Sequence, residues 1–201
     1  LITVRSVDKH LRQELSRGGA HICNEEQTSA LRRYLFCEPG FNVEALGRDA
    51  SWIASQAGFK VAQKTKILVT PIMMVGEGEP LSREKLCPFL GYYVSRDVSQ
   101  AISQARAVLR FAGTGHSAAI HSNNAQNIMN FSAKVEVCRV VVNAPCSQGA
   151  AGFSTNLAPT FTIGTGFFGR SSVGENIGPQ HLINWTQIAW NKENNTLDPS
   201  V

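Results

Sequence analysis

The sequence predicts one α/β domain with a mostly parallel sheet flanked by helices. Three observations lead to this prediction. Short apolar runs rich in β-branched residues alternate with segments whose apolar residues recur at helical spacing, as they do in βα units. With 201 residues, the chain is long enough for one ordinary domain with its own core. Its 43% hydrophobic and 17% charged residues are typical of a globular protein.

The first half of the chain carries two strand signals and three helix signals. Asn24 and Gln27 have the spacing of a capping box, in which two residues satisfy each other's backbone N–H at a helix start. Residues 66–72 form an apolar, β-branched run that is typical of a buried strand. The predicted elements are a strand over 1–4, a helix over 7–17 capped by Ser6, helices from Asn24 to about Phe36 and from Asp49 to Gly58, and the strand over 66–72.

The second half contains the clearest helix and then a long irregular segment. After Asp97 the apolar residues recur three and four positions apart until Gly113, so they share one helix face. The remaining predictions are strands over 89–94, 116–121 and 138–143, a helix over 124–134, and a final strand over 182–190. Residues 143–179 are rich in glycine and show no periodicity. A loop of that length is usually functional or disordered, and its Phe, Ile and Val residues argue for order.

Gly164, Gly166 and Gly169 form a literal G-x-G-x-x-G, the pattern of dinucleotide-binding loops. That fingerprint requires a strand before the glycines and a helix that begins at them. Residues 171–179 instead contain Ser, Gly and Pro, which favour turns. We therefore interpret the three glycines as part of an irregular loop.

Composition and charge exclude several classes of function. The formal net charge is +4 and the basic residues are scattered, so nucleic-acid binding is not expected. No apolar run of about eighteen residues is present, so no membrane span is expected. The 5 cysteines are widely spaced without a C-x-x-C pair, so neither a metal site nor a redox dithiol is predicted. Reduced thiols of this kind favour a cytoplasmic location.

Three blocks of sequence are familiar in combination. Residues 80–88 read PLSREKLCP, residues 113–122 read GTGHSAAIHS, and residues 142–149 read VNAPCSQG. Their order and spacing resemble the coenzyme A-acylating branch of the aldehyde dehydrogenase superfamily. The resemblance extends over essentially the whole chain. It implies that residues 1–180 are a catalytic domain of aldehyde dehydrogenase type, and that residues 181–201 are an oligomerisation strand and tail.

The resemblance also implies a chemistry. Enzymes of this branch oxidise a small aldehyde to an acyl-CoA with NAD or NADP, through a thioester on an enzyme cysteine. In the family this cysteine and the Rossmann domain lie upstream of the segment that matches residues 1–4, so the chain alone is expected to be inactive. The family's oligomer contacts predict a homo-oligomer that pairs through residues 182–190.

Site residues follow from the matched motifs. Glu84 would bind the hydroxyls of the nicotinamide ribose, although a carboxylate between Arg83 and Lys85 also fits a solvated loop. His116 matches the histidine of the acylating branch and suits proton transfer near neutral pH, although a histidine that backbone bonds fix at a strand start is the alternative.

The aldehyde pocket is expected in the glycine-rich segment. Its wall would include Cys146, Ser147, Thr160 and Phe161, with Cys146 as lining rather than a second nucleophile. Arg170 is a departure from the family, and its planar guanidinium would suit an anionic aldehyde if it faces the pocket. An exposed loop arginine is the other reading of that residue.

Two further functions remain open from the sequence. A hydrolytic aldehyde dehydrogenase would use water in place of coenzyme A, with a glutamate base upstream. A non-catalytic α/β binding or assembly module would keep the fold without the nucleophile. None of the 5 cysteines matches the nucleophile position of the family, and this absence favours the non-catalytic module.

Overall fold

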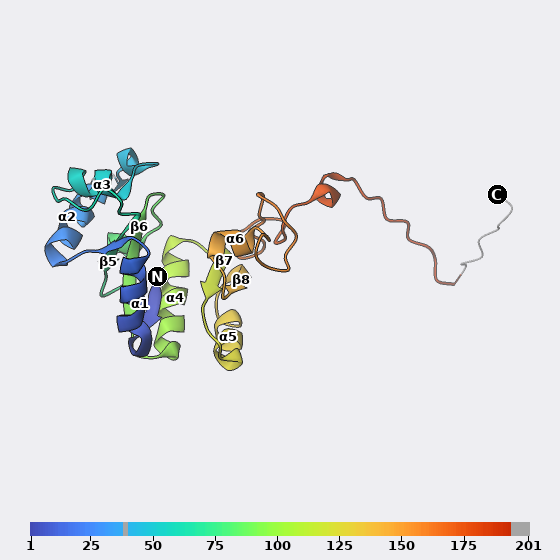
Figure 1. The fold of residues 1–201 in the computed structure, drawn as a ribbon. Coiled ribbons are helices and arrows are strands. Elements are labelled where there is room, and N and C mark those ends of the chain that lie inside the picture. Colours follow the sequence, from blue (N-terminus) through green and yellow to red (C-terminus); the bar gives the residue numbers. More distant parts are fainter. Residues whose placement is uncertain (38–39, 194–201) are drawn as a thin grey trace.

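The computed structural model describes residues 1–37 and 40–193, and its main sheet is parallel (Figure 1). Four strands lie in the order β1-β6-β5-β2, with every neighbouring pair parallel. Their bounds are β1 Ile2–Val4, β2 Ala20–Ile22, β5 Ile67–Pro71 and β6 Phe89–Ser95. The predicted α/β fold class is confirmed. The short β2 was missed, because three residues between a glycine pair and a helix cap carry no readable alternation.

A second, two-stranded parallel sheet pairs β7 (Gly115–Ile120) with β8 (Val137–Val142). Ala118 lies opposite Val140 in its register. A small antiparallel hairpin, β3 (Phe36–Cys37) with β4 (Gly40–Phe41), was not predicted from the sequence. The strands predicted over 66–72, 89–94, 116–121 and 138–143 thus form within one or two residues of their expected ends.

Six α-helices and three 3₁₀ helices are present in the described part of the chain. Their bounds are α1 Arg5–Arg17, α2 Glu25–Leu35, α3 Ala50–Gln56, α4 Val98–Ala112, α5 Ala125–Ser132 and α6 Cys146–Ala150, with η1 Val43–Ala45, η2 Pro80–Ser82 and η3 Pro179–Leu182. The capping box of Asn24 and Gln27 is confirmed. Asp97 accepts a hydrogen bond from the Gln100 backbone, as expected.

The cap predicted at Ser6 is wrong, and the cap predicted at Asp49 is confirmed in position only. Helix α1 begins at Arg5, with extended Val4 as the N-cap, so Ser6 lies inside the first turn. Asp49 does occupy the N-cap position of α3, but its side chain makes no capping hydrogen bond. For α1 the reason is that strand β1 runs directly into the helix at Arg5, so the junction lies before Ser6.

The hydrophobic core has two main clusters and a small third one of Val141, Ala144 and Ala150. The larger one is built from α2, α3, β5, β6 and η2, and Leu31, Leu68 and Leu81 are fully buried in it. The smaller one lies between α4, α5, β7 and β8, around Ile102 and Phe131. Helix α4 contacts β1 and β6 as well, so it lies between the two sheets (Figure 1).

Helix α6 (Cys146–Ala150) forms inside the segment that was predicted to be irregular, and after it the glycine-rich segment folds back on itself as irregular chain. The Gly164 and Gly166 amides donate to the carbonyls of Glu175 and Val173, which makes a narrow loop. No helix begins at the three glycines, so their interpretation as an irregular loop is confirmed.

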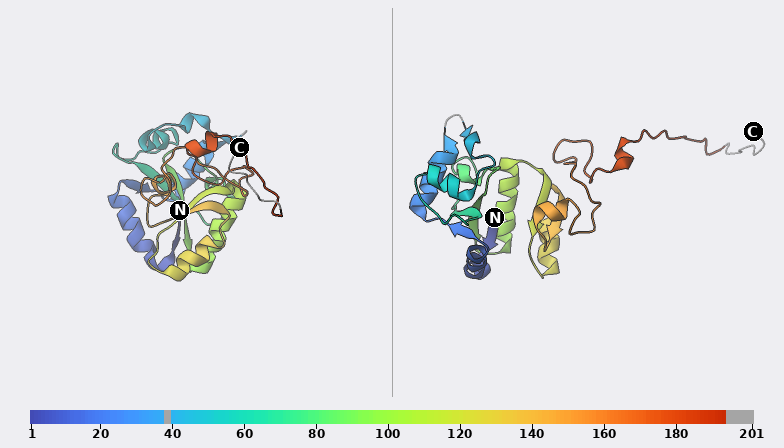
Figure 2. Two further views of the ribbon diagram at one scale, coloured as in Figure 1. Left: turned by 90° about the vertical axis from the view of Figure 1, so that its right-hand side faces the viewer. Right: turned by 45° about the horizontal axis from the view of Figure 1, so that its top comes forward.

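The final strand predicted over residues 182–190 does not form. Helix η3 ends at Leu182, and residues 183–190 have no regular secondary structure. A strand needs a neighbour for its backbone hydrogen bonds, and none is provided for it within residues 1–37 and 40–193. This segment extends away from the rest of the chain (Figure 2). The last part of the predicted tail, residues 194–201, lies outside the described residues. None of the described helices is long and apolar enough to cross a membrane.

Candidate functional site

A cleft of about 540 Å³ opens between the two sheets. One wall is the loop from η2 to β6, which carries Glu84 and Lys85. The other wall is the C-terminal turn of α4 and the start of β7, where His116 and Ser117 lie. Glu84 and His116 come from sequence motifs far apart, yet the fold places both at this one cleft.

Glu84 presents an uncommitted carboxylate to the cleft. It is exposed, and it makes no hydrogen bond or ion pair with any of the residues described. Its neighbour Arg83 lies over the ring of Phe111, 5.1 Å from the ring centroid. The carboxylate is therefore free to accept hydrogen bonds from a ligand, and no protein group has to be displaced first.

Lys85 is a cleft residue that the sequence did not single out. Its Nζ donates to the carbonyls of Leu81 and Arg83 and lies 4.8 Å from the ring centroid of Phe89. Burial lowers the pKa of Lys85 to about 8, although the nearby Cys87 and Glu79 oppose that shift. The signal that could have found it is its position next to Glu84.

His116 is the second residue of β7 and is exposed. Its Nδ1 lies 3.1 Å from Ser117 Oγ, and its side chain is open to solvent. Gly115 precedes it with φ 99°, and a Cβ there would collide with Gly169 and Thr165. The glycine-rich segment thus lies directly behind the strand start that carries His116.

The predicted pocket wall lies apart from this cleft in the structure. Cys146 is the first residue of α6 and is half-buried, and burial raises the pKa of its thiol. Ser147 beside it is exposed. Thr160 bonds the Thr162 carbonyl, and Phe161 is 92% exposed with its ring 5.4 Å from that of Phe153.

Arg170 also lies outside the cleft. It is exposed, and its backbone has φ 56°, a left-handed conformation that non-glycine residues rarely adopt. A second hollow, of about 430 Å³, lies along β8 and residues 154–157. It contains none of the predicted site residues. The structure therefore brings Glu84 and His116 together but does not bring Cys146, Ser147, Thr160, Phe161 or Arg170 to them.

Sequence reasoning missed the pair that holds the glycine-rich segment in place. Arg139 is 5% exposed, and it donates to Asn176 Oδ1, the Gly164 carbonyl and the Gly174 carbonyl. Asn176 in turn donates to the carbonyls of Ala150 and Ala158. A lone arginine inside an apolar strand was the available signal, because a buried charge must be paired or bonded.

Comparison with known proteins gives a consistent picture. The chain is 34% identical over 199 residues to the aldehyde-alcohol dehydrogenase of Clostridium acetobutylicum. The matched region covers 96% of this chain and 23% of that protein. It is 34% identical over 187 residues to the acetylating succinate-semialdehyde dehydrogenase of Clostridium kluyveri, covering 92% of this chain and 41% of that protein. No protein-family model matches the chain.

A solved structure agrees in fold. The acetylating aldehyde dehydrogenase from Geobacillus thermoglucosidasius matches with a TM-score of 0.90 and 29% identity, over 95% of this chain and 42% of that one. This chain thus spans about a quarter to two fifths of the length of the relatives it matches.

Proposed function

We propose that this chain, a homologue of one segment of the coenzyme A-acylating aldehyde dehydrogenases, is part of an enzyme that oxidises an aldehyde to an acyl-CoA. The observation that carries the proposal is the meeting of Glu84 and His116 at one cleft. These are the two residues that the family motifs assign to cofactor and to acyl transfer, and they lie 32 positions apart in the sequence.

Glu84 would hold NAD or NADP. Glu84 lines the cleft, and its carboxylate has no partner among the described residues, so it can accept hydrogen bonds from both hydroxyls of a ribose. The bound nicotinamide would supply the hydride acceptor. The role of Glu84 is to orient that ring, because two hydrogen bonds from one carboxylate fix the rotation of the sugar.

His116 would serve the transfer to coenzyme A. Its Nδ1 faces Ser117 Oγ, while Nε2 has no partner in the described part of the chain. A neutral imidazole nitrogen can take the thiol proton of coenzyme A as its sulfur attacks the acyl carbon, and the enzyme cysteine then leaves as a thiolate as the new thioester forms. This step makes the thiol a better nucleophile without requiring a strong base.

The nucleophile would come from residues outside these 201. Burial raises the pKa of the thiols of Cys23, Cys87 and Cys146, which disfavours the thiolate that such chemistry needs. None of the 5 cysteines matches the family's nucleophile position, so we expect the isolated segment to be inactive.

The substrate is proposed to be a small aldehyde, anionic if Arg170 reaches it. The guanidinium of Arg170 is exposed and forms no ion pair within residues 1–37 and 40–193, so it is free to bind a carboxylate. The Clostridium kluyveri relative is named for succinate semialdehyde, which carries such a group. We keep Cys146, Ser147, Thr160 and Phe161 as the proposed wall of the aldehyde pocket, although none of them lines the cleft that holds Glu84 and His116.

We also propose a cytoplasmic homo-oligomer that pairs through residues 182–190. The exposed fractions of Trp185 and Ile188 are 74% and 73%. Apolar side chains exposed in a row are typical of a contact surface, and a partner strand would provide the backbone hydrogen bonds that this segment lacks.

The test is the reduction of NAD(P)⁺ by the full-length protein, with and without coenzyme A, on neutral and anionic aldehydes. Reduction that depends on coenzyme A, and that is lost in His116→Ala but not in His121→Ala, is the expected result. His121 is the matched control because it follows the same strand but does not line the cleft.

Two other outcomes would assign the alternatives. Equal reduction without coenzyme A would indicate the hydrolytic branch and a structural role for His116. A full-length protein that binds neither NAD nor NADP would indicate the non-catalytic module.

A further inference from the structure

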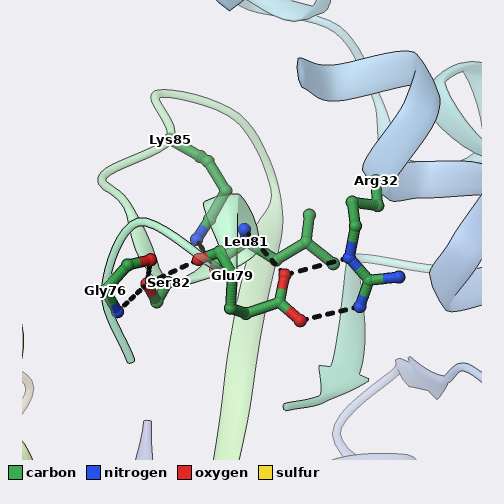
Figure 3. Close-up of polar contacts among 6 residues, drawn as sticks. All are labelled: Arg32, Gly76, Glu79, Leu81, Ser82 and Lys85. Carbon is green, nitrogen blue, oxygen red and sulfur yellow. Dashed lines mark hydrogen bonds and ion pairs between the residues drawn. The ribbon is translucent and has the colours of Figure 1, made fainter. Parts of the chain in front are cut away.

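We propose that the ion pair of Glu79 and Arg32 positions Glu84 for the cofactor. Glu79 and Arg32 would then be positioning residues of the enzyme. The inference rests on the proposed function of Glu84. Neither residue lines the cleft, and neither belongs to the motif residues assigned above. Figure 3 shows the pair and the turn that it supports.

The pair is a two-pronged contact between a loop and a core helix. Arg32 Nε donates to Glu79 Oε1 at 3.1 Å, and its Nη2 donates to Oε2 at 2.7 Å. Glu79 Oε1 also accepts the backbone N–H of Leu81 at 3.1 Å. One buried carboxylate thus joins helix α2 to the first turn of η2 (Figure 3).

Arg32 is attached to a rigid support. It lies on α2 between Leu31 and Leu35, both of which have no exposed surface. Glu79 is only 6% exposed, so its charge is costly unless it is paired. The hydrogen bonds that Arg32 donates to Glu79 raise the pKa of Arg32, as a close pair requires. The loop is therefore fixed against α2 at one defined point.

Hydrogen bonds and burial in the turn between Glu79 and Glu84 fix the backbone of Glu84 relative to the ion pair. Ser82 Oγ donates to the Glu79 carbonyl at 2.7 Å and accepts the Gly76 N–H at 3.1 Å. Leu81 is fully buried in the larger core cluster. Lys85, the residue that follows Glu84 in the sequence, donates from Nζ to the Leu81 carbonyl (Figure 3).

The backbone of Glu84 is consequently fixed by the Glu79 turn before it and by Lys85 after it, while its own carboxylate remains free. A carboxylate on a loose loop would have to be ordered each time a ligand binds, which lowers affinity. A displacement of about 1 Å is enough to cost a large factor in a positioned interaction. The pair and the turn thus provide preorganisation for the cleft wall.

The experiment uses the full-length protein with Glu79→Gln, Arg32→Gln and the double variant. Glutamine keeps the acceptor for Leu81 N–H but removes the charge. The matched control is Arg17→Gln, which breaks the exposed pair with Glu14 on α1, where the N···O distance is also 2.7 Å. Two measurements are made: the Kd of NAD(P)⁺ by fluorescence, and amide hydrogen exchange of residues 76–85 in cofactor-free protein.

We expect the Kd and KM of the cofactor to rise about tenfold in each single variant, with no further rise in the double variant. The KM of the aldehyde, and kcat at saturating cofactor, should change by less than about twofold. Exchange of the Leu81 and Ser82 amides should speed up, and Arg17→Gln should change none of these quantities.

Three results would overturn the inference. They are unchanged cofactor binding in folded Glu79→Gln or Arg32→Gln, a uniform loss in all kinetic constants, and unchanged exchange in the turn. If Glu79→Gln does not fold, Arg32→Gln decides, because Arg32 lies at the edge of the core with 36% of its side chain exposed.

Failure of the proposed function has a different signature. Wild-type protein that binds no cofactor, or Glu84→Ala that binds it normally, would refute the assignment of Glu84. Normal binding by Glu79→Gln together with weak binding by Glu84→Ala would refute the positioning role alone.

Discussion

Arg139 Nε lies 2.6 Å from Asn176 Oδ1, and this bond joins strand β8 to the end of the glycine-rich segment, 37 positions later in the chain. Both side chains are buried. Together they make hydrogen bonds to four backbone carbonyls of the segment, those of Gly164, Gly174, Ala150 and Ala158. An otherwise irregular loop thus has a polar centre in place of a hydrophobic one.

The first prediction is that Arg139→Met lowers the free energy of unfolding by roughly 3 kcal/mol, since it leaves two carbonyls and an amide oxygen without a buried donor. Urea unfolding of the full-length protein measures this. Arg170→Met is the control in the same segment, and as an exposed position it should change stability by no more than about 0.5 kcal/mol. Equal effects of the two substitutions would contradict the structural role given to Arg139.

The second prediction concerns the close approach at the start of β7. Gly115→Ala places a Cβ against Gly169 and Thr165 and also requires an alanine at φ 99°. We expect a loss of about 3 kcal/mol, from overpacking and backbone strain together.

Gly113→Ala separates those two causes. Gly113 has φ 129° but nothing within 4 Å of the Cβ position. Its substitution should cost about 2 kcal/mol, from backbone strain alone, and so less than Gly115→Ala. Thermal or urea unfolding compares the two variants, and a Gly113→Ala variant as unstable as Gly115→Ala would show that contact with residues 165–169 does not matter.

The third prediction is a pH dependence that originates at Lys85. Its pKa is about 8 in the folded protein, against an ordinary 10.5, because of burial. Between those values the unfolded chain holds a proton that the folded protein lacks, so stability from this group increases as the pH rises. Below about pH 8, both states are protonated and the full penalty of a buried charge remains.

Lys85→Met isolates that contribution. The difference in unfolding free energy, wild type minus Lys85→Met, should rise from pH 8 towards 10.5 and be flat below pH 7. Unfolding curves of both proteins across this range measure it, and other titrating groups cancel in the difference. A difference that falls with rising pH would mean that the ammonium is stabilised, not destabilised, where it lies.

Much of the fold could be predicted from the sequence, because its signals are local. The capping box at Asn24 and the amphipathic run after Asp97 both specify their helices within a few residues. The cap at Ser6 failed because β1 continues directly into α1 at Arg5, and that junction is set by the sheet. The strand over 182–190 failed because alternation records only which faces are apolar and cannot supply a pairing partner.

The site could be predicted only in part, for a related reason. Motif matching identified Glu84 and His116, and the fold places them at one cleft. It did not identify Lys85, Glu79 or Arg139, whose importance depends on burial and on partners remote in sequence. Such residues have no short pattern around them, because what defines them is a contact made across the fold.

Helix α4 has a consequence for how the molecule unfolds. One of its faces packs on β1 and β6 and the other on β7, β8 and α5, while the larger core cluster around α2 and α3 lies elsewhere. The two clusters share no residue. We therefore expect loss of α4 packing to destabilise the cluster of Ile102 and Phe131, in the half that carries His116, more than the cluster around Leu81, in the half that carries Glu84.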